Sequence, residues 1–334
     1  MKTEYNLDIS PKEEWLRSFP DILALYEENP LRTTFEKYEN SANRFKKLYI
    51  RATYLALTLI GGSLLVGLGL WVFPELISGA KTVTFAAGGL GVLGIAIEVY
   101  MILFKVKEKW LLNRYGAERV RSFVASSFAL GATASDKKEL SAALNKFSVT
   151  CLSNLDADLN KGVAAFRSFS AVEALILPTA QKLENDKIFV QSKAAYEYFR
   201  VEYQQRFVEG ELAKLEDHSR VQNFVSDIIF ISGALLAVGS LLAFNIEGVI
   251  SRIMIFVSAT LFFLSAVLGI AGQGTSSKPH LARYKSYLDD IRLLGPASGQ
   301  STSSFVKRVE KMELLALREL DVFCQQIDSI STRI

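Results

Sequence analysis

One charged helical face carries the most distinctive chemistry in this sequence. Trp110, Arg114 and Glu118 recur at intervals of four and therefore share one face of a helix, which Arg121 extends. Arginine presents a planar fork of donors that suits phosphate, so Arg114, Arg119 and Arg121 are the candidates for binding an anionic ligand. The alternative is a ladder of Arg–Glu pairs that links helices, with Trp110 as an anchor at a membrane interface.

Enzyme chemistry has no comparable basis in the sequence. The two histidines, His218 and His280, are far apart, and neither accompanies a cysteine pair or a carboxylate cluster with metal-ligand spacing. Cys151 and Cys324 fall in segments that we predict to be cytoplasmic, so we expect no disulfide. We therefore predict no enzyme activity, no cofactor and no metal.

Four apolar segments decide the fold class. The chain has 334 residues, of which 50% are apolar, and its net charge is only +3. Residues 52–73, 82–104, 222–244 and 249–271 form segments of 22 or 23 residues, each a helix of about 33 Å that can cross a hydrocarbon core. Short loops join them in pairs. The sequence predicts an all-α integral membrane protein with four transmembrane helices in two hairpins.

Basic residues orient the hairpins. They cluster before the first and third segments and after the second and fourth, whereas the opposite side offers only Lys81 in the first loop and Arg252 near the start of the fourth segment. Positive charge marks the cytoplasmic side, so both termini and the middle segment are predicted to be cytoplasmic. The residues expected at the membrane interface are Trp71, Trp110, Lys105, Lys107 and Lys109.

The expected organisation follows from these segments. N-terminal cytoplasmic helices occupy residues 1–50, with an amphipathic helix from Ser10 to Tyr26 and a second helix from about Thr33 into the first span. The remaining parts are the first hairpin (51–105), a cytoplasmic helical region with a long stalk helix (106–221), the second hairpin (222–272) and C-terminal cytoplasmic helices (273–334). The two hairpins also match each other as a divergent repeat.

Glu98 is the most unusual residue inside a predicted span, where a carboxylate is costly and faces protein or water. Gly94 and Gly91 share its helix face, and Gly62 and Gly67 provide small residues on the first span. One interpretation is an acidic group that lines a pore in an oligomer. The other is an interfacial carboxylate that pairs with a basic side chain nearby.

The charged face resembles a bacterial family of two-transmembrane effectors known as SLATT. Its hallmark after the second span is a Trp, an Arg four residues later and a Glu four residues after that, with basic residues beside it. Trp110, Arg114, Glu118, Arg119 and Arg121 match this pattern.

A second signature of the family leads into the next hairpin, and the resemblance covers roughly residues 30 to 290. The segment after the fourth apolar stretch departs from the hallmark, because it keeps Arg283 and Tyr284 but lacks the Trp and Glu. The residues that match the second signature are Tyr196, Arg200, Gln204 and Phe207.

The resemblance implies a pore-forming effector of a bacterial antiviral system, located in the inner membrane. We expect a homo-oligomer, with a tetramer as the first guess, controlled by a nucleotide, an oligonucleotide or a partner protein at its cytoplasmic helices. Control would pass along a stiff helix continuous with the second span. The alternative is a non-conducting membrane scaffold that recruits a cytoplasmic partner.

Overall fold

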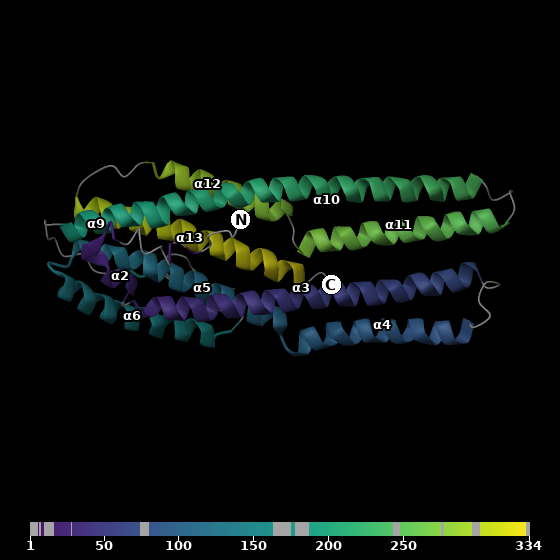
Figure 1. The fold of residues 1–334 in the computed structure, drawn as a ribbon, viewed down its shortest axis with the longest axis horizontal. Helices are drawn as coiled ribbons and strands as arrows, with labels where there is room; N and C mark the ends of the chain where they lie inside the picture. The colour runs from purple at the N-terminus through teal and green to yellow at the C-terminus, as the bar shows by residue number, and fades with distance from the viewer. Residues whose placement is uncertain are drawn as a thin grey trace. The chain divides into compact units, whose positions relative to one another are not determined.

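The structure is a computed structural model in which the described part of the chain is all α-helical, without a strand (Figure 1). Among the described residues, the first long helix is α3 (Pro30–Val72) and the last is α13 (Thr302–Ser331). The described residues are 6, 8–9, 17–27, 29–73, 80–162, 175–177, 187–242, 248–274, 277–295 and 301–331.

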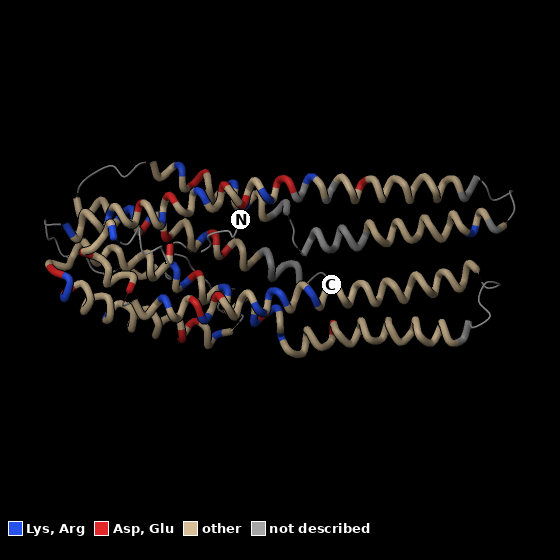
Figure 2. The backbone as a smooth tube through the Cα atoms, in the orientation of Figure 1, with Lys and Arg blue, Asp and Glu red and all other residues tan. Residues whose placement is uncertain are grey.

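The chain divides into two compact units, each formed by segments distant in sequence. We call the first the charged bundle, which comprises Met1–Arg44, Glu108–Ala213 and Leu281–Ile334. We call the second the apolar unit, which comprises Phe45–Lys107 and Lys214–His280. Lys, Arg, Asp and Glu are frequent along the charged bundle and rare along the apolar unit (Figure 2).

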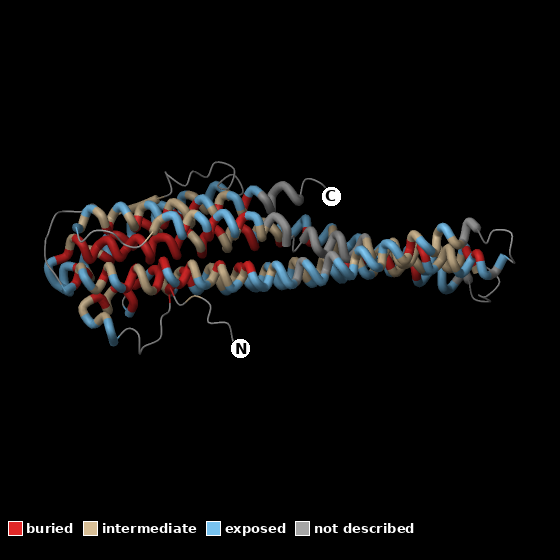
Figure 3. Tube along the Cα trace, turned by 90° about the horizontal axis from the view of Figure 1, so that it is seen from above, coloured by how far each residue is buried: buried red, intermediate tan, exposed pale blue. Residues whose placement is uncertain are grey.

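The charged bundle is built around an aromatic core. Tyr26 packs edge-to-face against Phe128 and Phe199, and Tyr196 packs in the same way against Phe305, with ring centroids 5.6 to 5.8 Å apart. Figure 3 shows the resulting concentration of buried residues. The charged bundle contains the N-terminal part of α3 and the start of α10 (Tyr203–Leu242). Its other elements are η1 (Pro20–Ile22), α2 (Ala24–Glu27), α5 (Val106–Ser127), η3 (Phe128–Ala132), α6 (Lys137–Asn160), α9 (Lys187–Tyr196), η4 (Glu197–Glu202), α12 (Ser277–Leu293) and α13.

The apolar unit contains parts of α3 and α10 together with α4 (Ala80–Leu103) and α11 (Gly248–Gly274). Phe73, which directly follows α3, packs its ring edge-to-face on Phe256 of α11. Helix α10 contacts α11 through Phe230 and Phe262, with ring centroids 5.5 Å apart. Aromatic side chains therefore connect the two predicted hairpins inside this unit.

Two helices in the described part of the chain are long and apolar enough to cross a membrane. One lies within Ala24–Val72 and the other is Thr82–Leu103. In α10 and α11 the apolar helical stretches Phe224–Gly239 and Ile250–Ser265 are shorter. The all-α fold and the first pair of membrane helices thus have structural support, whereas the second pair stays a prediction.

The chain is not helical throughout the junction between α4 and α5, in contrast to the prediction from the sequence. A continuous helix was expected from the second span through the charged face, but α4 ends at Leu103 and α5 begins at Val106. Between them Lys105 has φ of 51°, in the left-handed region that side chains disfavour. A helix cannot continue through such a residue, so a stiff rod from α4 into α5 is excluded.

Two further helices differ from expectation. Residues 10–16, with the expected helix start at Ser10, lie outside the described residues; after them Pro20 opens a 3₁₀ turn and α-helix covers only Ala24–Glu27. The stalk is helical from Lys187 onwards as predicted, but residues Glu197–Glu202 form a π-helix. Such segments are rare and are frequent at functional sites. This one contains Arg200.

Candidate functional site

The charged face of α5 lies against carboxylates of three segments. Arg114 pairs with Glu118 on its own helix and with Glu39 of α3, whose Oε2 is 3.1 Å from Nη1. Arg121 Nε is 3.5 Å from Glu118 Oε2 and 3.7 Å from Asp8 Oδ2. Glu118 thus lies between two guanidinium groups, and α5 is joined to α3 and to residues 6–9.

Arg200 of η4 also contacts Asp8, together with a further carboxylate, Glu313. Its Nε and Nη2 donate to the two carboxylate oxygens of Glu313, each at 2.8 Å, which is the bidentate geometry of a strong pair. The Tyr196 hydroxyl donates to Glu313 at 3.2 Å. Arg200 and Glu313 are both nearly inaccessible to solvent, so the pair fixes η4 to α13.

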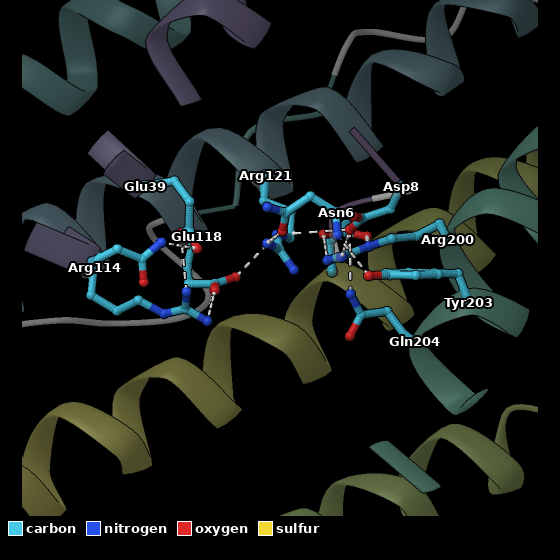
Figure 4. Close-up of polar contacts among 11 residues, drawn as sticks. Asn6, Asp8, Glu39, Arg114, Glu118, Arg121, Arg200, Tyr203 and Gln204 are labelled. Carbon is cyan, nitrogen blue, oxygen red and sulfur yellow. Dashed lines mark hydrogen bonds and ion pairs between the residues drawn. The ribbon is translucent and has the colours of Figure 1, made fainter. Parts of the chain in front are cut away.

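Asp8 brings the two arginines together (Figure 4). Its Oδ2 accepts from Arg200 Nη1 at 3.2 Å and from Gln204 Nε2 at 3.3 Å, and it faces Arg121. Asn6 adds two bonds: its Oδ1 accepts from Arg121 Nη2 at 2.6 Å, and its backbone N–H donates to the Tyr203 hydroxyl at 2.9 Å. Asn6 and Asp8 therefore connect the two sequence motifs, which lie about 80 residues apart.

The electrostatics keep the cluster ionised. Burial alone would raise the pKa of Glu118, but the charges of Arg114 and Arg121 outweigh it and hold the pKa below its usual value. Burial likewise opposes charge on Arg121, yet Asp8 and Glu118 raise its pKa. Both groups are therefore charged at neutral pH.

Arg119 points to a different environment. It is 1% exposed, and its Nη2 lies 3.7 Å from Asp158 Oδ2 on α6. Its guanidinium lies 5.0 Å from the centre of the Phe123 ring, a cation–π contact. Burial lowers the pKa of Arg119 and raises the pKa of the neighbouring Cys151 thiol to about 12. Cys151 and Cys324 are both free and buried.

A further ion pair lies between α12 and α13. Arg283 Nε is 3.0 Å from Glu319 Oε1, and the guanidinium stacks 4.8 Å from the centre of the Phe323 ring. Burial and the charge of Glu118 raise the pKa of Glu319, and Arg283 offsets only part of this effect. Glu118 and Glu319 therefore have pKa values shifted in opposite directions.

This geometry changes how Arg114, Arg119 and Arg121 are interpreted. The structure realises the Arg–Glu ladder that the sequence offered as the alternative, since all three arginines face carboxylates. Arg119 and Arg121 are buried as well. Asp8 and Asn6 occupy donors of Arg121, so a ligand there must compete with them, and ligand binding stays a prediction.

The four glycines expected at helix contacts separate into two groups. A Cβ on Gly94 would lie 2.7 Å from Ile60 Cγ1 and 3.0 Å from the Ala56 carbonyl oxygen, and one on Gly91 would lie 2.8 Å from Ser63 Oγ. These two glycines therefore pack against α3 within one chain. In contrast, Gly62 and Gly67 have open space around their Cβ positions, and Glu98 is half-buried.

The predicted interface residues also differ among themselves. Trp71 is exposed and Trp110 is buried in the charged bundle. The structure therefore leaves Trp71 available to lipid headgroups, whereas Trp110 belongs to a protein core instead. Lys105 and Lys109 are exposed and Lys107 is half-buried.

Sequence reasoning missed Asp8 and Glu313, which complete the cluster. Asp8 carries no local signal, because its partners are more than 100 residues away. Glu313, in contrast, carried a signal in the local sequence. It lies four residues after Val309 and one after Met312, on the apolar stripe of α13, and a carboxylate at a buried position requires a cationic partner.

Comparison of the chain with protein-family models, with curated proteins and with solved structures finds no match. Within the described residues no group of three or more His, Cys, Asp and Glu side chains could hold a metal ion. The SLATT resemblance, the expected lack of a cofactor and the hairpin repeat therefore stay predictions.

Proposed function

We propose that the protein is an integral membrane protein whose apolar unit lies in the bilayer and whose charged bundle lies in the cytoplasm. One observation carries this proposal: the apolar unit turns large apolar side chains outward. Phe85 is 84% exposed, and Ile102 and Leu103 are each 72% exposed. Soluble monomers rarely expose a contiguous apolar surface of this kind, and lipid chains would cover it.

The second pair of membrane helices is part of this proposal. On α10 and α11 the outward side chains are again apolar, including Phe224, Ile231, Leu235 and Ile253. Helix α11 has 27 residues and α10 has 40, so both are long enough to span the hydrocarbon core. Together with α3 and α4 they give four spans, with both termini on the cytoplasmic side.

We further propose that subunits assemble into a gated pore in the bacterial inner membrane. A single subunit with four spans encloses little space, so a water-filled path needs several copies. Gly62 and Gly67 leave room for a neighbouring helix to approach closely. Glu98 is half-buried in an apolar helix, and a carboxylate there is stabilised by water or protein. A pore mouth supplies both.

The resemblance to SLATT effectors extends the proposal to a role in antiviral defence, with an anionic signal or a partner protein acting at the charged bundle. The π-helix and the Arg121–Asp8–Arg200 cluster support control at this place, because they join α5 to α10. Helix α10 itself continues into the apolar stretch Phe224–Gly239. A signal that rearranges the cluster would therefore act on that stretch.

The test combines assembly with conductance. We expect purified protein to form oligomers by native mass spectrometry and to conduct in planar bilayers. Glu98→Gln is expected to change the reversal potential in a salt gradient while leaving the oligomer intact. Gly67→Leu is expected to disrupt the oligomer without unfolding the subunit. An oligomer that never conducts would favour the scaffold instead, and a monomer would contradict the pore.

A further inference from the structure

The same guanidinium of Arg200 holds two carboxylates in very different ways. Its contacts with Glu313 are paired and short, at 2.8 Å each. Its contact with Asp8 is single and long, at 3.2 Å, whereas charge-assisted bonds of this type are about 2.7–2.9 Å. Glu313 is thus the fixed structural partner, and Asp8 is the loosely held one.

The remaining donors around Asp8 are also poorly matched to a carboxylate. Gln204 Nε2 shares the oxygen that Arg200 uses, at 3.3 Å, and Arg121 Nε is 3.7 Å from it. Asp8 Oδ1 is buried and has no hydrogen-bond partner among the described residues, and the same is true of Arg121 Nε. The buried donor Arg121 Nε and the buried acceptor Asp8 Oδ1 therefore make no hydrogen bond in the protein, although burial has removed the hydrogen bonds that each would make to water.

An anion with more oxygens would correct this mismatch. A phosphate group presents three or four oxygens in a tetrahedral arrangement and accepts paired bonds from guanidinium groups. Arg121 of α5, Arg200 of η4 and Gln204 of α10 converge on Asp8 Oδ2, which suits such a group. Asp8 satisfies only part of these donors, because it offers two oxygens and uses one.

We propose that Asp8 is the built-in occupant of an oxyanion site formed by Arg121, Arg200 and Gln204, and that a phosphate-bearing ligand replaces its carboxylate. Asp8 is 5% exposed and Ile9 is 1% exposed, so the ligand takes the place of Asp8 as Asn6, Asp8 and Ile9 leave. Their departure breaks the bonds of Asn6 to Arg121 and Tyr203 and so releases α5 from α10. This inference rests on the proposed control at the charged bundle, but its test needs no pore.

The competition between Asp8 and the ligand gives the expected effect. A ligand that binds only the fraction of molecules with an open site has its apparent affinity reduced by that fraction. Removing the Asp8 carboxylate opens the site permanently. Inorganic pyrophosphate should therefore bind the Asp8→Ala protein at least about tenfold more tightly than the parent.

The experiment uses the full chain in phospholipid-free detergent, with pyrophosphate titrated calorimetrically into four proteins. Asp8→Ala and the isosteric Asp8→Asn are expected to bind more tightly than the parent. The exposed Asp289→Ala on α12 is the matched control and is expected to behave like the parent. Adding Arg121→Gln to Asp8→Ala should remove the gain. Equal affinity in the Asp8 variants, the parent and the control would overturn the proposal, as would a gain that survives Arg121→Gln.

A second measurement uses the parent protein and does not depend on any variant folding. At saturating pyrophosphate, the amides of Asn6, Asp8 and Ile9 should exchange with deuterium faster, because the ligand has displaced them. Unchanged exchange at saturation would contradict the proposal. Competition by short-chain phosphatidic acid assigns the phosphate to a lipid headgroup, and its failure to compete assigns it to a soluble ligand. A bound ligand with no measurable conductance would reject the pore but not this site.

Discussion

The charged bundle and the apolar unit bury opposite kinds of side chain. In the bundle, arginines and carboxylates lie inside together with aromatic rings, as for Arg200, Glu313 and Tyr196. In the apolar unit, large apolar side chains lie outside and glycines lie at the helix contacts, as for Gly94 against α3. The first arrangement needs water around it, because only then does burial favour an apolar core. The second fits the proposed location in a bilayer, where small residues let helices approach each other closely.

The two regions therefore obtain specificity differently. Pairing each buried arginine with a particular carboxylate fixes which helices meet in the bundle, and a wrong neighbour would leave an uncompensated charge. In the apolar unit the helices meet where a missing side chain permits close approach. We expect substitutions that remove charge to damage the first region and substitutions that add bulk to damage the second.

The largest effect is expected for Arg200→Met. This change leaves Glu313 buried without its bidentate partner, and breaking a buried pair in this way costs about 3–5 kcal/mol. The control is Arg292→Met, which removes the exposed pair with Glu209 at 2.8 Å and should cost about 1 kcal/mol or less. Denaturant unfolding followed by near-ultraviolet circular dichroism measures both. Similar costs for the two variants would show that the cluster is not a structural centre.

Added bulk should have the next largest effect. The Gly94→Leu variant would place a Cβ too close to Ile60 and to the Ala56 carbonyl oxygen, and overpacking of this kind costs about 1–3 kcal/mol. Gly88→Leu is the matched control, since that position on the same helix is exposed and has nothing within 4 Å. Thermal unfolding in detergent compares them. If Gly88→Leu is the more harmful variant, α4 contacts its neighbours through the opposite face.

A smaller effect distinguishes two carboxylates within the bundle by pH. The pKa of Glu118 is lowered, so its contribution to stability is complete above its usual value of 4.5 and is lost as pH falls through the folded-state pKa. The pKa of Glu319 is raised, so stability is lost instead as pH rises from 4.5 through the folded-state pKa.

Melting temperatures between pH 3 and about 7 test these opposite signs. The destabilisation by Glu118→Gln should disappear at the acid end of the range. For Glu319→Gln, the melting temperature relative to the parent should rise with pH above 4.5. Parallel curves for the two variants and the parent would mean that neither carboxylate titrates abnormally in the fold.

The sequence predicted the elements that depend on local pattern. Apolar length gave the helices of the first hairpin, and the four-residue spacing correctly placed Arg114 and Glu118 together on α5. The break at Lys105 could not be predicted, because a lysine in the left-handed region is a local cost that only the surrounding structure imposes. The same holds for the π-helix at Arg200, which a repeat of ordinary helical spacing does not reveal.

The sequence predicted the arginines of the candidate site but not the carboxylates that pair with them. Arg114, Arg119 and Arg121 were identified from their spacing, but their partners Glu39, Asp158 and Asp8 come from other helices or from residues 6–9. Long-range pairing leaves no trace in the local sequence, so arginines that form a ladder could not be told from arginines that wait for a ligand.

The central claim is that the outward apolar side chains face lipid. Spin labels at Val92 and Ile95 on α4 and at Ile253 and Leu264 on α11, in protein reconstituted into vesicles, test it most directly. Val149, on the outside of α6 in the charged bundle, is the control at comparable exposure. We expect labels on α4 and α11 to collide with oxygen and to be shielded from a water-soluble nickel chelate, and we expect the reverse for the label at Val149. Nickel access at all five positions would place the apolar unit in water and overturn its proposed location in the bilayer.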